Sequence, residues 1–90
     1  MTAVSRIVEV VNKRGLHARA SAKFVGLASE LDAVIEVEKD GQRVCGTSIM
    51  GLMMLGAAMG DSIVIHSDGI HSEMALEKLV TLVEDRFGEE

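Results

Sequence analysis

A histidine followed by basic residues marks the most chemically distinctive stretch of this sequence, RGLHARASAKFV at residues 14–25. His17 follows a Gly-Leu pair and stands where a helical pattern begins, a position that usually takes Ser, Thr, Asp or Asn. No acidic residue lies nearby, and four basic residues surround it in the sequence: Lys13, Arg14, Arg19 and Lys23. Free amide groups at a helix start and these cations together predict a site that favours an anion.

The formal net charge of −5 hides an uneven distribution along the chain. Residues 1–29 carry five basic groups and one acid, whereas residues 30–90 carry four basic groups and thirteen acids. A small cationic patch on an acidic chain argues against general nucleic-acid binding, which needs broad phosphate neutralisation. It suits capture of one anion or docking against an acidic protein surface, with simply solvated lysines and arginines as the alternative.

The length of 90 residues and a hydrophobic content of 48% predict one domain spanning residues 1–90. There is no proline, tryptophan or tyrosine and there are only two phenylalanines, so the core must be aliphatic. The single cysteine, Cys45, excludes an internal disulfide framework and suits a reducing compartment. The sequence shows neither a secretory signal nor a run of about 20 apolar residues, so we expect a cytoplasmic protein without membrane insertion.

The elements that must position His17 can be predicted from hydrophobic periodicity. Residues 4–11 favour a strand, a helical period starts at Ala18, and residues 33–39 alternate as a half-buried strand. The Asp-Gly pair within KDGQ predicts a hairpin that returns through residues 43–45, and residues 62–67 favour a further strand. A last helix carries one apolar stripe, comprising Ala75, Leu76, Leu79, Leu82, Val83 and Phe87. This order predicts a two-layer α+β sandwich with one face of the sheet open.

Residues 46–60, GTSIMGLMMLGAAMG, contain no charge. Thr47 or Ser48 is a natural N-cap for a short helix that begins near Ile49. Such a helix would be apolar all round, and a small domain cannot bury its whole circumference. Methionine side chains adapt to differently shaped partners, which favours an exposed docking surface over a purely structural role.

GLHAR followed by a helix, and SIMGLMMLG some thirty residues later, together resemble the histidine-containing phosphocarrier protein (HPr) of the phosphoenolpyruvate-dependent phosphotransferase system. The resemblance covers nearly the whole chain, and HARASAKFV is similar to alphaproteobacterial members. It implies an α+β open-faced β-sandwich (βαββαβα), in which a four-stranded antiparallel sheet carries three helices on one face.

The resemblance also implies the roles of particular residues. His17 would accept a phosphoryl group from enzyme I as pros-phosphohistidine, and Arg19 would stabilise that group. Ser48 matches a serine that a dedicated kinase (HPr kinase/phosphorylase) modifies in some bacteria. Ile49, Met50 and Met53 match the surface that docks enzyme I and the IIA domains of sugar transport. The protein would be a monomeric carrier and not a complete enzyme, with neither cofactor nor metal.

The residue chemistry is compatible with that role. A neutral imidazole is a competent nucleophile near pH 7 and, unlike serine, needs no base. A Ser-His-Asp site would require an acid beside the histidine, and the sequence around His17 supplies none. We therefore expect the helix start and Arg19 to hold phosphate oxygens while no carboxylate contacts the ring.

Two positions depart from the family pattern, and for several others we expect only a structural role. Ala20 replaces the usual proline of the first helical turn, and Thr47 replaces the basic residue that often precedes the regulatory serine. We expect His66 and His71 at the surface, Cys45 in the core, and the segment EDRFGEE as a frayed helix end.

The alternative function is a regulatory adaptor in nitrogen or carbon control, whose phosphorylation governs partner binding without sugar transport. A small metal or anion store has little support.

Overall fold

Four strands form one antiparallel sheet in the spatial order β1-β4-β2-β3, in a computed structural model that describes residues 3–89. The strands are β1 (Ala3–Glu9), β2 (Val34–Lys39), β3 (Gln42–Cys45) and β4 (Ser62–Asp68). The fourth strand in sequence therefore lies between the first and the second, with Val8 opposite Ile63 on one side and Val37 opposite Ile65 on the other. Every neighbouring pair is antiparallel, as predicted.

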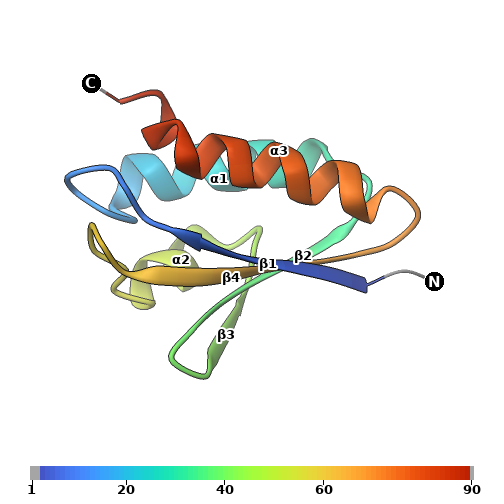
Figure 1. Cartoon of the computed structure of the whole chain (residues 1–90), viewed down its shortest axis with the longest axis horizontal. Coiled ribbons are helices and arrows are strands. Elements are labelled where there is room, and N and C mark those ends of the chain that lie inside the picture. The colour runs from blue at the N-terminus through green and yellow to red at the C-terminus, as the bar shows by residue number, and fades with distance from the viewer. Residues whose placement is uncertain (1–2, 90) are drawn as a thin grey trace.

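The helices lie mainly over one face of this sheet. Helices α1 (Ala18–Glu30) and α3 (Ser72–Glu84) run side by side across it, and the opposite face is left open (Figure 1). The short helix α2 (Ile49–Met54) contacts α1 and β3. The predicted open-faced βαββαβα sandwich is confirmed, and a 3-10 helix, η1 (Arg86–Gly88), follows α3.

The alternation of side chains along the strands explains why the helices collect on one face. Ile35 and Val37 of β2 are buried beneath the helices, while Glu36 and Glu38 between them are partly exposed on the open face. Phe24 of α1 is fully buried against the same core. Burying each of these large apolar side chains contributes about 1.5–3 kcal/mol, which favours packing of the helices on this face.

The predicted hairpin joins β2 to β3 through a two-residue loop. Asp40 and Gly41 both have positive φ, 51° and 83°, and Lys39 pairs with Gln42 around them. Positive φ at both loop residues matches the right-handed twist of the flanking strands, which is why Asp-Gly is favoured here.

The prediction for the last segment is wrong in two respects. The apolar stripe was expected to carry Phe87 on the last helix, but α3 ends at Glu84 and Phe87 lies in η1, where it is 1% exposed. The tail was expected to fray, yet Lys23 Nζ donates a hydrogen bond of 2.7 Å to the carbonyl of Phe87. Burial of the Phe87 ring accounts for this packing; Glu90 lies outside the described residues.

The expected core position of Cys45 is also wrong. Cys45 ends β3 at the edge of the sheet and pairs in register with Glu36, whose side chain is on the open face. Alternation therefore turns Cys45 toward the same face, where it is exposed with its Sγ 3.0 Å from Thr47 Oγ1. That hydroxyl contact lowers the pKa of the Cys45 thiol.

The remaining histidines lie where surface positions were expected. His71 is exposed before α3, and His66 lies partly exposed on the open face, with its Nε2 2.8 Å from Glu38 Oε1. Within residues 3–89, no helix combines the length and apolarity that crossing a bilayer would need.

Candidate functional site

His17 is itself the N-cap of α1. Its backbone is extended (φ −72°, ψ −179°), and its Nδ1 accepts a hydrogen bond of 3.3 Å from the backbone N–H of Arg19. The imidazole thus satisfies one of the free donors that a Ser or Asp oxygen would otherwise take. The first turn of α1 contains no acidic residue, so the positive end of the helix dipole faces the ring.

The loop before His17 is fixed by a glycine and by the segment that follows α2. Gly15 has φ +65°, and a Cβ there would lie 2.3 Å from the carbonyl oxygen of Ala57. The next residue, Leu16, donates its N–H to that same oxygen at 2.9 Å and is buried. Only glycine allows this close approach, which places His17 beside the end of α2.

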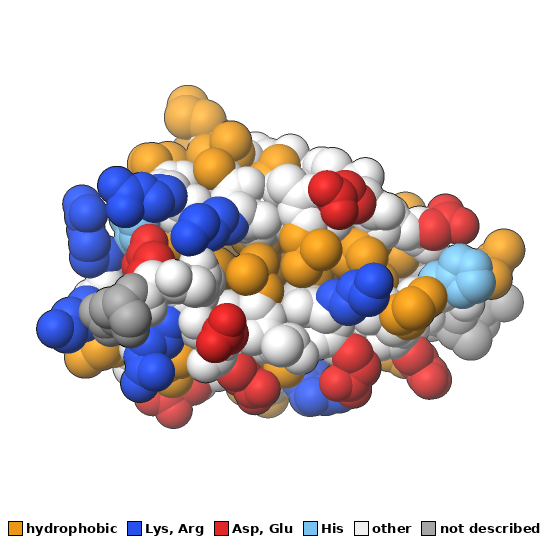
Figure 2. All heavy atoms as spheres, turned by 90° about the horizontal axis from the view of Figure 1, so that it is seen from above, with side chains coloured by type: hydrophobic (Ala, Val, Ile, Leu, Met, Phe, Trp, Pro, Cys, Tyr) orange, Lys and Arg blue, Asp and Glu red, His pale blue; other side chains and the backbone are white. Residues whose placement is uncertain are grey.

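Basic side chains gather around the start of α1. Figure 2 shows several Lys and Arg side chains at one end of the molecule, and the sequence around His17 supplies Lys13, Arg14, Arg19 and Lys23. The Arg19 side chain is exposed, and among residues 3–89 its guanidinium makes no ion pair. Its planar fork is therefore available to two oxygens of an anion beside His17.

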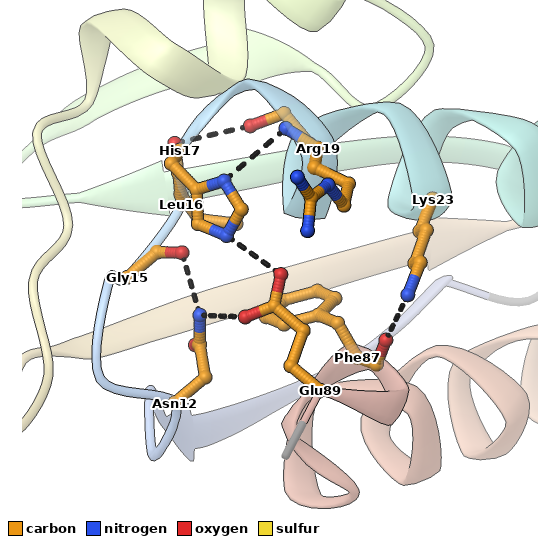
Figure 3. Close-up of polar contacts among 9 residues, drawn as sticks. Asn12, Gly15, Leu16, His17, Arg19, Lys23, Phe87 and Glu89 are labelled. Carbon is orange, nitrogen blue, oxygen red and sulfur yellow. Dashed lines mark hydrogen bonds and ion pairs between the residues drawn. The ribbon is translucent and has the colours of Figure 1, made fainter.

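One expectation about this site is wrong, because a carboxylate does contact the ring. His17 Nε2 lies 2.7 Å from Glu89 Oε2, and the two side chains are each 16% exposed (Figure 3). Glu89 reaches the site through a turn of positive φ at Arg86, Phe87 and Gly88, with values of 56°, 56° and 73°. This turn folds the end of the described chain back onto the start of α1.

Asn12 holds the Glu89 carboxylate. Its Nδ2 donates to Glu89 Oε1 at 3.3 Å and to the carbonyl of Gly15 at 2.8 Å, and the side chain is fully buried. Partial burial alone would raise the pKa of Glu89, but hydrogen bonds from His17 and Asn12, together with the charge of Lys23, bring it below its ordinary value. Glu89 is therefore an ionised hydrogen-bond acceptor at neutral pH.

Sequence reasoning missed both Asn12 and Glu89. The Phe-Gly pair at residues 87–88 is a signal for a chain reversal, because glycine often follows a helix end with positive φ. That signal predicts a turn but not its target, since Glu89 lies 72 residues from His17 along the chain.

A second group of predicted residues lies on and before α2. Ser48 is the N-cap of α2, and its Oγ accepts a hydrogen bond of 3.0 Å from the N–H of Gly51. Leu52 is fully buried, whereas Ile49, Met50 and Met53 are 41%, 72% and 43% exposed. The uncharged segment thus divides into a buried anchor and an exposed apolar surface, as expected.

The site combines a ring nitrogen that accepts a long hydrogen bond from the Arg19 N–H, a helix start and an exposed guanidinium. Such an arrangement can hold a tetrahedral anion and bond it covalently to the ring without removing a proton from the nucleophile. Among the described residues, no three His, Cys, Asp or Glu side chains lie together as a metal site.

Comparisons with known proteins agree with the fold. Residues 4–85 match the family model described as the PTS HPr component phosphorylation site. The phosphocarrier protein HPr of Neisseria meningitidis is 48% identical over 82 residues, covering 91% of this chain and 92% of that protein. HPr of Cupriavidus necator is 40% identical over 86 residues, covering 96% and 97% of the two chains. The crystal structure of HPr-C-His from Thermoanaerobacter tengcongensis superposes with a TM-score of 0.89 at 44% identity, covering 100% of this chain and 99% of that one.

The open-faced sandwich, the family match and the similarity to curated phosphocarrier proteins assign the chain to the class of small phosphocarrier proteins. The chain belongs to the HPr family of the phosphotransferase system.

Proposed function

We propose that this chain acts as one phosphocarrier domain that accepts a phosphoryl group on Nδ1 of His17 from enzyme I and passes it to IIA domains. The observation that carries the proposal is the hydrogen bond from the Arg19 amide to Nδ1 at the start of α1, together with the exposed Arg19 side chain. The protein supplies alignment and charge, and the partner completes the site.

In the proposed reaction, the Nδ1 lone pair attacks phosphorus in the phosphohistidine of enzyme I. The Nδ1–P bond forms as the P–N bond to enzyme I breaks, and its electron pair returns to the donor ring. The phosphoryl oxygens then accept the N–H of Arg19, which the ring releases, and the Arg19 guanidinium. Nothing in this step requires a cofactor or a metal from the carrier.

The test is incubation of the purified chain with enzyme I and phosphoenolpyruvate, followed by intact-mass measurement. We expect one acid-labile phosphoryl adduct in the wild type and in His66→Ala, and none in His17→Ala. Arg19→Ala should accept the group more slowly. A wild type that remains unmodified beside a competent enzyme I, or an adduct retained in His17→Ala, would refute the carrier role of His17.

The exposed apolar surface Ile49, Met50 and Met53 is the proposed docking site for enzyme I and IIA domains, because it belongs to α2, which packs against the helix that His17 caps. Ser48, at the edge of this surface, is the proposed regulatory site for a kinase of the HPr kinase/phosphorylase type. A phosphate there would place about two negative charges beside an apolar docking face while remaining at a helix N-terminus, where it is tolerated.

The second candidate is a regulatory adaptor in nitrogen or carbon control, whose partners read the state of His17 or Ser48. The same exposed surface favours it, since docking there needs no onward transfer of the phosphoryl group. The two functions separate in one measurement: a carrier loses its phosphoryl group to a IIA domain within the assay, whereas an adaptor binds its partner and keeps the group.

A further inference from the structure

The side of the His17 ring that faces away from α1 is held by a carboxylate. Nε2 lies 2.7 Å from Glu89 Oε2, and the other oxygen of that carboxylate accepts from the buried amide of Asn12 (Figure 3). With only 16% of either side chain exposed, the pair is largely screened from water. The ring is therefore fixed at both nitrogens, by Arg19 N–H on one side and Glu89 on the other.

These two contacts are compatible with one protonation state of the imidazole. The Arg19 amide can only donate, so Nδ1 must present a lone pair. An ionised carboxylate can only accept, so Nε2 must carry the proton. Both a doubly protonated ring and the opposite tautomer would set two N–H donors against each other at Nδ1. The opposite tautomer would also leave the contact between Nε2 and Glu89 without a proton.

Asn12 explains how a side chain from the end of the described chain keeps its place. The Asn12 amide nitrogen bridges Glu89 Oε1 and the carbonyl of Gly15, which ties the carboxylate to the loop that precedes His17. Its Oδ1 is buried without a partner, so the amide orientation is set by these two acceptors. The buried Phe87 ring and the Lys23 hydrogen bond to its carbonyl hold the same segment from the other side.

We propose that Glu89, held by Asn12, is a positioning residue for phosphoryl transfer that fixes His17 in the Nε2–H tautomer and offsets the positive charge of the phosphorylated ring. This role rests on the proposed carrier function of His17. When the Nδ1–P bond forms, the ring keeps its Nε2 proton and becomes cationic. The adjacent carboxylate stabilises that charge, as the aspartate does for the imidazolium of a serine protease. When the bond breaks, the electron pair returns to Nδ1 and the same tautomer is restored, so no proton moves in either direction.

The decisive variant is Glu89→Gln. It keeps the size of the side chain but replaces a charged group that only accepts hydrogen bonds with a neutral amide that can also donate them. We expect ¹⁵N NMR of the imidazole to show one dominant Nε2–H tautomer in the wild type and a mixture in Glu89→Gln. The rate of phosphoryl acceptance from enzyme I should fall by roughly tenfold, the effect of losing one charge-assisted hydrogen bond.

Glu84→Gln is the matched control, because it makes the same charge change at an exposed position at the end of α3. It should leave both the tautomer and the rate unchanged. Asn12→Ala should shift the tautomer in the same direction as Glu89→Gln, and the double variant should add little, because both changes release one carboxylate. Amide NMR spectra of each variant verify that the fold is retained.

The outcomes separate this role from the carrier function itself. If the wild type accepts the phosphoryl group and Glu89→Gln accepts it equally fast with an unchanged tautomer, the positioning role is overturned. A wild-type ring protonated at Nδ1 overturns it as well. If the wild type accepts no phosphoryl group, the carrier function fails and takes the transfer role with it, whatever the tautomer of the ring.

Discussion

At the scale of single residues, His17 does two jobs that normally fall to different side chains. It caps α1 through Nδ1 in place of a serine or aspartate, and the same lone pair is the proposed nucleophile. The capping bond is long, at 3.3 Å, so giving it up to a phosphoryl group costs little. A residue with a better capping oxygen would stabilise the helix more but could not carry the group as a nitrogen–phosphorus bond.

The Glu89 carboxylate gives a pH-dependent prediction at this scale. Its pKa in the folded protein lies below the ordinary value of 4.5, which is retained when the chain unfolds. The free energy that the ionised carboxylate adds to folding is therefore fully present above about pH 4.5 and is lost as pH falls through the lower folded pKa. The side chains that lower its pKa are His17, Asn12 and Lys23.

Urea unfolding of wild type and Glu89→Gln at pH 7 and at pH 2.5 measures this effect. We expect the wild type to be the more stable protein at pH 7 and the difference to shrink at the lower pH. A difference that grows on acidification would mean that the carboxylate is bound in its protonated form.

At the scale of elements, the start of α1 depends on Gly15. Replacing it with alanine combines a positive φ with a clash against Ala57, so we expect a loss of about 1–3 kcal/mol and slower phosphoryl acceptance by His17. Gly26 is the control, since it lies inside α1 with open space around its Cβ position. Gly26→Ala should stabilise the protein by up to about 1 kcal/mol. Thermal unfolding of both variants checks the pair, and equal effects would show that the Ala57 contact does not matter.

The cap of α2 gives the second prediction at this scale. Ser48→Ala removes the oxygen that binds the Gly51 amide and should cost about 0.5–2 kcal/mol of stability. Ser48→Asp keeps a capping oxygen and should cost less, but its charge beside Met50 and Met53 should weaken enzyme I binding. Calorimetric titration with enzyme I, beside unfolding curves, compares the two variants. Equal affinities for Ser48→Asp and wild type would remove Ser48 as a docking switch.

At the scale of the whole molecule, the local charge near His17 opposes the net charge. The chain carries −5 in total, yet four basic residues flank His17 in the sequence. The molecule measures 35 × 26 × 20 Å, which exceeds the Debye length of about 10 Å at 0.1 M salt. A docking partner therefore responds to the nearby cluster more than to the distant acids.

We accordingly predict that added salt slows association with enzyme I, although repulsion between two acidic proteins would predict the opposite. Arg14→Gln should lower the association rate at low salt. Arg43→Gln should not, because Arg43 pairs with Glu36 on the sheet. Stopped-flow rates at several salt concentrations decide the question, and faster association at high salt would show that net charge dominates.

The sequence predicted the structural features that are set by neighbouring residues better than those that depend on residues far apart in the chain. The start of α1 and the Asp40–Gly41 hairpin were predicted correctly, because each is set by residues a few positions apart. For the cap of α2 the sequence left Thr47 and Ser48 open, and the structure has Ser48. Cys45 was misplaced because strand register, not composition, decides which face it occupies. Glu89 was missed because a left-handed turn at residues 86–88 brings it to His17 from far along the chain.

The position of β4 between β1 and β2 has a consequence for a chain emerging from the ribosome. Ala3 pairs with Asp68, so β1 has no neighbouring strand until residues 62–68 have been synthesised. Glu89 follows β4 in the chain, so its contact with His17 can form only after all four strands have been synthesised. The tautomer that we propose for His17 can therefore become fixed only after β4 and the turn at residues 86–88 have been synthesised.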